Sequence, residues 1–366
     1  MRIKKDNLAI LASLILVLIS LTDQAIPGAR YAKYLIPPVC IIFWLYSFPH
    51  SINTSPEARP FYLYITISLI YLLTGFFGIW DGDFTDVYFV IAYSAPFFLT
   101  RPQRIDAGAV FSCFAWLFVL LSIFKSTLTG DGFSFDFLGS ASTFEHSEFG
   151  FIFSFFTVFF YKEKRFKLLV FAVILCLLSL KRIALLAAIF GVLVVYTKHL
   201  WYRDRYTVPI AFAAANLAAI TLLQFITTED FNDFSEDLFN ISSNQLLMGR
   251  ATIYKYIFAN TEIHWTYGEG PGSIYKYASL AVGSLEKYLA HSDIIKFSTE
   301  FGYLFLLSFF FLAYYSSKEY IEYIVSANII MLTDNIFIYT SVFFVLLFII
   351  SQSVIGVSRY EKGVNS

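Results

Sequence analysis

Apolar residues dominate the chain and gather into runs that short polar turns separate. Runs of roughly 15–22 apolar residues predict helices that cross a bilayer, because a helix satisfies its own backbone polar groups in lipid. The sequence therefore predicts an all-α polytopic membrane protein with about 12 transmembrane helices. The expected spans are 8–22, 34–49, 61–80, 87–100, 108–124, 147–161, 167–181, 184–200, 207–226, 299–315, 320–335 and 337–357. Several are short, which predicts tilted or broken helices, and 167–200 fits one re-entrant pair as well as two spans.

One long polar interval interrupts this pattern late in the chain, at 227–298. It divides the sequence into a transmembrane bundle (1–226), the loop itself (227–298), and three further spans with a tail (299–366). Ser242 and Ser243 are typical helix-capping residues, and apolar residues at helical spacing follow them. We expect one amphipathic helix here that carries Arg250 and lies on the membrane surface.

Lys and Arg residues in the short loops set the orientation of the spans. With the amino terminus in the cytoplasm, the inner segments carry 16 Lys and Arg, and the short outer segments carry five. The amino end resembles a secretory signal, but this charge count holds only if it is retained as a span. We therefore expect both termini in the cytoplasm and the 227–298 loop on the outer face.

Composition agrees with this assignment and narrows the partners. The chain of 366 residues is 58% hydrophobic and 14% charged, whereas about a quarter of the residues in a soluble domain are charged. A net charge of -1 argues against a nucleic-acid partner. Cys40, Cys113 and Cys176 all lie inside apolar runs, so we expect packing residues rather than a disulfide or a metal site.

Lys181 and Arg182 are an exception to the charge rule, because they fall in an outer turn between two apolar runs. Charged side chains at such a depth cost at least a few kcal/mol and usually face a cavity or a partner. One interpretation is a snorkelling pair or an error in the topology. The other is an anion site at the outer membrane face, where the planar fork of an Arg matches phosphate oxygens.

Candidate binding residues lie in the first part of the long loop. Arg250 is either a solvated surface residue or a second cation of the same anion site. Gly268–Gly272 reads Gly-Glu-Gly-Pro-Gly, a turn that either links two helices or brings the backbone of Gly270 and Gly272 close to a ligand. Tyr254 is one of several aromatic residues nearby, and such rings suit a membrane interface as well as the stacking on sugar faces.

Candidate catalytic residues lie at the end of the loop. Histidine is the side chain whose ordinary pKa lies nearest neutral pH, so His291 could take a proton from a hydroxyl, although a lone His is more often structural. Asp293 and Glu300 follow it, and Glu300 is either a partner of the His or the base itself. Glu148 and Asp334, near the outer ends of two spans, are further polar groups expected to line the same cavity.

Paired acids at Asp81 and Asp83, on a short outer loop, raise the question of a divalent cation. Acids are common in short loops, so the solvated interpretation is the simpler one. We predict no metal site, and a chelator separates the two interpretations.

These features together resemble one family. They are the many spans, the basic turn Ser-Leu-Lys-Arg-Ile-Ala-Leu-Leu at 179–186, and a late outer loop. The loop carries Gly249-Arg250, a Gly-Pro-Gly turn, His291-Ser292 and Glu300-Phe301-Gly302. The set resembles the O-antigen polymerase (Wzy) group of the O-antigen polymerase/ligase superfamily, over most of the chain by topology and at a handful of positions by residue. The family turn more often reads Ser-Arg-Thr, so either Lys181 or Arg182 is the operative cation.

The resemblance implies a bacterial inner-membrane glycosyltransferase of GT-C-like architecture that needs no cofactor or metal. Such an enzyme joins repeat units carried on undecaprenyl diphosphate at the periplasmic face, and its expected partners are that lipid-linked oligosaccharide, membrane lipid and a chain-length regulator protein. The roles that it implies are diphosphate binding by Lys181, Arg182 and Arg250, catalysis by His291 and Glu300, and substrate binding by Tyr254, Gly270, Gly272 and Asp293.

Two other functions compete with this one. The related ligase uses the same donor but transfers the glycan to lipid A core, so cells without it still make long lipid-linked chains. A transporter or flippase for lipid-linked oligosaccharides usually places charges near the membrane midplane and often has paired halves. Here the polar residues gather at one face, and the sequence shows no paired halves.

Overall fold

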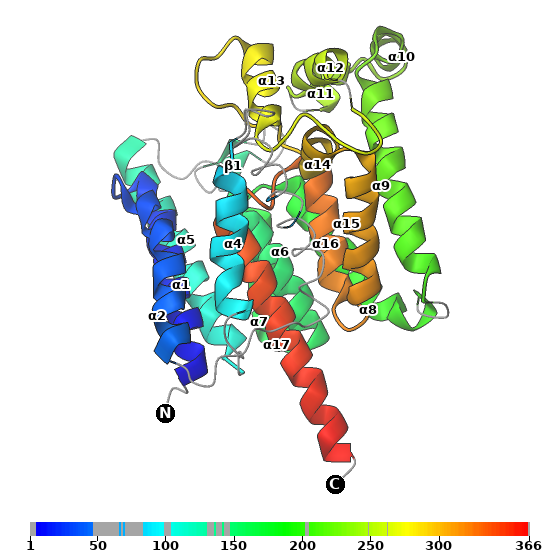
Figure 1. Cartoon of the computed structure of the whole chain (residues 1–366). Helices are drawn as coiled ribbons and strands as arrows, with labels where there is room; N and C mark the ends of the chain where they lie inside the picture. The colour runs from blue at the N-terminus through cyan, green and yellow to red at the C-terminus, as the bar shows by residue number, and fades with distance from the viewer. Residues whose placement is uncertain are drawn as a thin grey trace.

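The computed structural model describes residues 5–46, 66, 69, 83–98, 104–129, 135–136, 141–142, 147–201, 205–247, 249–261 and 263–364. Within these ranges the regular secondary structure is helical, apart from one antiparallel pair of two-residue strands, β1 (Phe135–Asp136) and β2 (Ala141–Ser142). The long helices stand side by side as a bundle, and several short helices lie across one of its ends (Figure 1). We call this the loop end of the bundle and the opposite end the tail end.

Eleven of the twelve expected spans coincide with helices of the bundle, with ends that differ by up to seven residues. The remaining expected span, 61–80, lies outside the described residues except for positions 66 and 69. Among the described residues, three helices are long and apolar enough to cross a membrane, over Ala107–Thr127, Arg182–Leu200 and Thr207–Ile226, and several shorter apolar helices accompany them. The fold is therefore that of a helical membrane protein.

The bundle helices are α1 (Lys5–Ser20), α2 (Ile36–Tyr46), α4 (Thr85–Phe98), α5 (Ala107–Thr129), α6 (Ser147–Lys162), α7 (Phe166–Leu178), α8 (Arg182–Trp201), α9 (Thr207–Ile226), α15 (Tyr303–Ser316), α16 (Ile321–Thr333) and α17 (Thr340–Val364), with the 3-10 helices η1 (Leu21–Gln24) and η2 (Ala29–Leu35) after α1.

Helices α8 and α16 pack closely in opposite directions. Gly191 permits the contact, because a Cβ at this position would collide with the side chains of Ser326 and Val158. The hydroxyl of Ser326 also donates to the carbonyl of Ala187, at 2.9 Å. At the tail end, the buried carboxylate of Glu322 pairs with Lys198 at 3.4 Å and with Lys162. This pairing compensates a charge that would be costly to leave alone in a buried position.

The layer at the loop end consists of α10 (Glu229–Phe239), α11 (Ser243–Leu246), α12 (Ala251–Asn260), α13 (Ser273–Val282) and α14 (Asp293–Phe301). The expectation of a single amphipathic helix after Ser242 and Ser243 is wrong, because two helices stand there. Ser242 caps a single turn with Gln245 as its reciprocal partner. Gly249, at φ 84°, then redirects the chain into α12. Arg250 therefore lies at the amino end of a new helix instead of on the face of an older one.

Helix α14 joins this layer to the bundle. All nine of its residues are buried, and it packs against α13, α15 and α16. It continues to Phe301, so the boundary that the sequence predicts between loop and span at 298 falls inside this helix. Gly302, at φ 87°, then starts α15, and a Cβ there would come within 2.8 Å of the carbonyl of His264. The polar residues of α14 are thus held inside protein, below the outer surface of the layer.

Candidate functional site

Arg250 reaches from the start of α12 to the end of α16. Its Nη1 donates to the carbonyl of Thr333, the last residue of α16, and its Nη2 lies 3.9 Å from a carboxylate oxygen of Asp334. The side chain keeps 19% of its surface exposed, while that of Asp334 keeps 4%. The guanidinium is therefore positioned by the carboxyl end of a helix, where cations are favoured, and still reaches solvent.

His291 faces the same carboxylate from the other side. Its Nδ1 lies 3.5 Å from the second oxygen of Asp334, and its side chain is 26% exposed. The backbone of His291 has φ 54°, a left-handed conformation that residues with a Cβ adopt uncommonly. The hydroxyl of Tyr254 donates to the carbonyl of His291 at 3.2 Å and helps to hold this conformation. Strained backbone of this kind gathers at functional sites, so it marks His291 as a candidate.

Asp293 shapes the floor of the site without reaching its surface. One carboxylate oxygen accepts from the backbone N–H groups of Ile336 and Phe337, at 2.6 and 3.3 Å, so it fixes the loop after α16. Its own N–H donates to the carbonyl of Asp334. Burial raises the pKa of this carboxyl to about 8, although the two N–H donors and Lys296 oppose the shift. Asp293 is therefore suited to position Asp334 from below.

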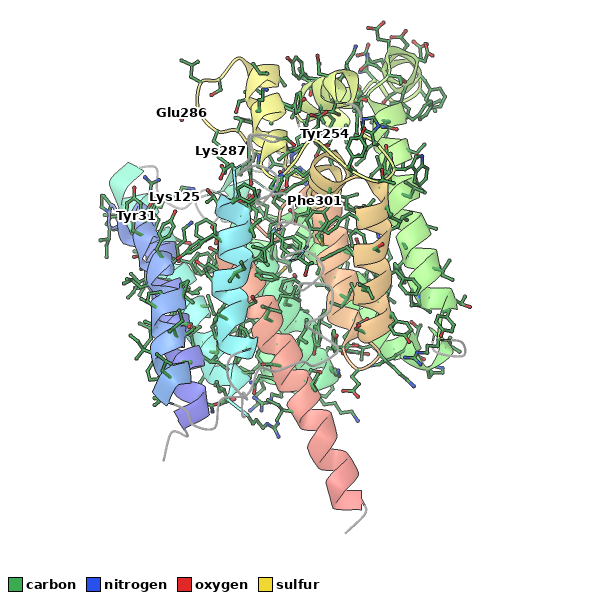
Figure 2. The ribbon with its side chains drawn as sticks, in the orientation of Figure 1. Tyr31, Lys125, Tyr254, Glu286, Lys287 and Phe301 are labelled. Atoms are coloured by element: carbon green, nitrogen blue, oxygen red, sulfur yellow. The ribbon has the colours of Figure 1, made fainter. Side chains whose placement is uncertain are left out.

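The structure thus brings together four residues of the loop that the sequence analysis selected, around a fifth from the bundle. Arg250, Tyr254, His291 and Asp293 come from α12 and from the start of α14, and Asp334 joins them from the end of α16. We call these five residues the Asp334 cluster. Figure 2 labels Tyr254, whose side chain lies at the loop end of the bundle.

Lys181 and Arg182 lie at the same end of the bundle as this cluster. Two contacts between α8 and α16 show this. Near the end of α8, Lys198 pairs with Glu322 at the start of α16, and earlier in α8, Ala187 contacts Ser326, which lies later in α16. The antiparallel register, at 1.5 Å per residue, therefore carries the start of α8 toward the end of α16, where Arg250 binds. Arg182 is exposed and Lys181 is half-buried. The residue before them, Leu180, has φ 54°, so this turn is strained as well.

Glu300 belongs to a second polar group, centred on Lys296. The buried ammonium of Lys296 lies 2.9 Å from Glu300 and 2.6 Å from Asp86 of α4, and the hydroxyl of Tyr275 also donates to Asp86. We call these four residues the Lys296 network. Burial raises the pKa of Glu300 to about 7, against the opposing charge of Lys296. Glu300 is 1% exposed, so its predicted role as partner or base of His291 stays a prediction.

The Gly268–Gly272 turn packs on the end of α14. The N–H of Gly272 donates to the carboxylate of Glu300 at 2.8 Å, and the N–H of Gly270 donates to the carbonyl of Glu300 at 3.0 Å. A Cβ on Gly268 would collide with the backbone of Thr299 and Glu300. These glycines therefore allow a close approach between backbones, and their predicted contact with a substrate stays a prediction.

Asp83 is the described half of the acidic pair, whereas Asp81 lies outside the described residues. Lys287, in the loop after α13, pairs with Asp83 at 2.6 Å above the start of α4 (Figure 2). Burial alone would raise the pKa of Asp83, but its hydrogen bonds with Lys287 and Thr85 outweigh burial and lower the pKa to about 2. The carboxylate thus joins the outer layer to α4. Among the described residues, no group of three or more His, Cys, Asp or Glu side chains is arranged to hold a metal ion.

Sequence reasoning missed the Lys296 network as a unit. The i,i+4 spacing of Lys296 and Glu300 was a usable signal, because such pairs face each other on a helix. The third member, Asp86, lies 210 residues away along the chain, and no local pattern indicates that contact. A buried Lys between two acids is visible only once α4, α13 and α14 are in place.

These observations define a class: a helical membrane protein with a polar cluster at the end of its bundle that a layer of short helices covers. Comparison of the chain with family models, curated proteins and solved structures finds no match. The chemistry of the cluster therefore carries the functional argument.

Proposed function

We propose that this protein is a polysaccharide polymerase of the O-antigen type. It would join repeat units carried on undecaprenyl diphosphate, at the outer face of a bacterial inner membrane. The observation that carries the proposal is the Asp334 cluster, in which a partly exposed Arg and a partly exposed His share one buried carboxylate at the end of an apolar bundle. Such a pairing sets a group for binding phosphate beside a group for moving a proton.

Arg250 would act on the donor. The reaction breaks the bond between the anomeric carbon of the donor glycan and its diphosphate, so negative charge develops on the departing lipid diphosphate. Fixed donors aimed at such charge are often the largest contribution to catalysis. Lys181 or Arg182, at the same end of the bundle, would supply further positive charge for the same group.

His291 would act on the acceptor. The hydroxyl of the next lipid-linked unit attacks the anomeric carbon, and its proton passes to the imidazole. Because Nδ1 of His291 faces Asp334, Nε2 is the nitrogen left to accept that proton. Asp334 would stabilise the imidazolium that results. The new bond joins the two glycans, and undecaprenyl diphosphate leaves.

The test is polymerisation of a defined lipid-linked repeat unit by purified protein in detergent or vesicles, with and without a chelator. We expect long chains from the wild type in both conditions. Arg250→Ala and His291→Ala are expected to lower the rate by about a hundredfold or more, since single groups of this kind contribute on that order. Lys255→Ala is the matched control, because Lys255 lies on α12 as well but pairs with Glu229 at the surface.

Each outcome decides between functions. Wild-type chain lengths in both the Arg250 and His291 variants would refute the roles assigned here. Transfer of preformed chains to lipid A core, without chain growth, would identify a ligase. Movement of lipid-linked units across vesicles with no new sugar linkage would identify a transporter.

A further inference from the structure

A groove with an apolar lining runs down the bundle between α7 and α8, with α6 as its floor. Its volume is about 490 Å³. The residues that line it are Thr157, Tyr161, Leu169, Val170, Val173, Ile174, Cys176, Leu185, Ala188, Ile189, Val192 and Leu193. The side chains of Val170, Ile174, Ile189 and Leu193 are about half exposed, so the groove opens sideways from the bundle.

The groove is closed at the loop end of the bundle by the turn between α7 and α8. Helices α7 and α8 form a hairpin that makes few contacts between its two arms, and α6 packs against both of them. The arms meet at the turn of Leu180, Lys181 and Arg182, where a Cβ on Gly150 of α6 would lie 3.0 Å from that of Lys181. The groove between the two helices therefore begins next to Lys181 and Arg182 at the loop end and runs from there toward the tail end.

We propose that this groove holds the polyprenyl tail of the lipid-linked substrate. The inference rests on the proposed function and adds to it the site of the tail. The charges at the loop end match an anionic head group, and the apolar lining matches a hydrocarbon chain that descends from it. An amphiphile with its diphosphate beside Lys181 and Arg182 would place its first isoprene units between Leu185 and Cys176.

A polyprenyl tail in this groove competes with the tails of exchanging phospholipids. Lipid tails are as apolar as the lining, so the transfer of a tail from the bilayer gains little from the hydrophobic effect. Selectivity must then come from packing. A polyprenyl chain carries a methyl group at regular intervals, and the lining includes the β-branched residues Val173, Ile189 and Val192, whose side chains are stiff.

The first experiment maps the tail by photo-cross-linking. A photoreactive benzoylphenylalanine is placed at Ile189 in the groove, or at Leu222 on α9, whose side chain is similarly exposed. Each protein is reconstituted with a radiolabelled polyprenyl diphosphate or with a labelled phosphatidylglycerol. We expect the ratio of polyprenyl to phospholipid adducts to be several-fold higher at Ile189 than at Leu222. Equal ratios at the two positions would mean that ordinary membrane lipid fills the groove, and would overturn the proposal.

The second experiment separates the tail site from the reaction. Val173→Trp fills the groove, and Leu222→Trp adds the same bulk on a helix that does not line it. For a donor with a long tail, we expect Val173→Trp to raise KM about fivefold with kcat retained, as loss of uniform binding does. For a donor cut to two isoprene units, wild type and Val173→Trp should not differ.

The outcomes of the two proposals remain distinguishable. If wild type polymerises and Val173→Trp shows unchanged KM with long-tailed donors, the groove is not the tail site and the function stands. If the polyprenyl probe labels Ile189 selectively but no chain growth occurs, the groove stands and the polymerase assignment fails.

Discussion

At the residue scale, Asp334 connects the two groups that the proposed chemistry needs. Its two carboxylate oxygens face Arg250 and His291 separately, at 3.9 and 3.5 Å. The carboxylate is buried, so its charge acts on both neighbours with little screening by water. A change at this one residue therefore reaches both partners.

Asp334→Asn is expected to retain the fold and lose activity. The amide keeps the shape of the side chain but removes the negative charge that faces both Arg250 and His291. We expect a loss in kcat of about a hundredfold or more, since an Asp-to-Asn change beside a catalytic His has cost even more elsewhere. The measurement is the initial rate with the lipid-linked repeat unit. Activity within twofold of wild type would remove Asp334 from the mechanism.

Asp293 gives the protein a dependence of stability on pH. Its pKa in the folded state, about 8, lies above the ordinary value of an unfolded chain, so the folded state binds more protons in between. The free energy of unfolding is therefore highest in acid and falls as pH rises through 8. We expect the Tm in detergent to drop by several degrees between pH 5 and pH 8.5, and the drop to be smaller in Asp293→Asn.

Asp83→Asn is the control for that experiment. The pKa of Asp83 is lowered to about 2, so this group is ionised in both states above pH 5 and contributes no slope there. An unchanged slope in Asp293→Asn, with the same backbone contacts kept by its amide oxygen, would contradict the assignment.

The residues of the site differ in how far the sequence alone could indicate them. Arg250 and His291 could be selected from the sequence because they stand in Gly249-Arg250 and His291-Ser292, two of the pairs on which the family resemblance rests. Tyr254 and Asp293 act through backbone contacts to His291 and to the loop after α16, and those contacts need the fold. Glu300 was expected to be either a partner of His291 or the base itself, and α14 places it in the protein interior beside Lys296.

At the element scale, the Lys296 network joins three helices that are remote in sequence. Asp86 comes from α4, Tyr275 from α13, and Lys296 and Glu300 from α14. Buried ion pairs add little net stability, but removing one partner leaves an uncompensated charge. The network therefore fixes how the outer layer sits on the bundle.

Lys296→Met should destabilise the protein by about 3–5 kcal/mol, because Asp86 and Glu300 then remain buried beside each other without a cation. The measurement is thermal unfolding in detergent, followed by protection of the outer layer against proteolysis. Lys255→Met is the matched control, since its pair with Glu229 is exposed and such pairs contribute about 0–1 kcal/mol. Equal stability of the two variants would mean that the network does not hold the layer.

Helix positions were predictable from hydrophobic runs, while the ends of short helices were not. The apolar pattern located α5, α8 and α9 because their length and composition leave few alternatives. The break between α11 and α12 depends on Gly249 in a left-handed conformation, and a single Gly within an apolar pattern does not reveal that. The charges of Lys296 and Glu300 within α14 are compensated by the Lys296 network, whose contact with α4 no local sequence pattern indicates.

At the scale of the whole molecule, α1 begins and α17 ends at the same end of the bundle, opposite the layer (Figure 1). Basic side chains of this tail end include Arg104, Lys162, Arg165 and Lys198, each beside an acidic partner. The excess of Lys and Arg in short loops predicts that this end faces the cytoplasm. The arrangement in space thus agrees with one orientation of the chain, which a labelling experiment can test.

Single cysteines placed at opposite ends test that orientation. In a background without Cys40, Cys113 and Cys176, Leu285→Cys lies in the exposed loop after α13, and Glu319→Cys lies at the tail end. We expect a membrane-impermeant maleimide to label the first in intact cells, and the second only after permeabilisation. The reverse pattern would invert the topology and place the Asp334 cluster in the cytoplasm.

Several helices of the bundle are short for a bilayer. Helices α7 and α16 have 13 residues each, which at 1.5 Å per residue is about 20 Å, against roughly 30 Å of hydrocarbon. Around them the surrounding lipid must thin, or the polar layer must sink below the level of neighbouring head groups. A carrier lipid would then meet the Asp334 cluster in a depression of the membrane surface. Its phosphates would not have to rise toward water, and its chain could stay immersed throughout the transfer of sugar.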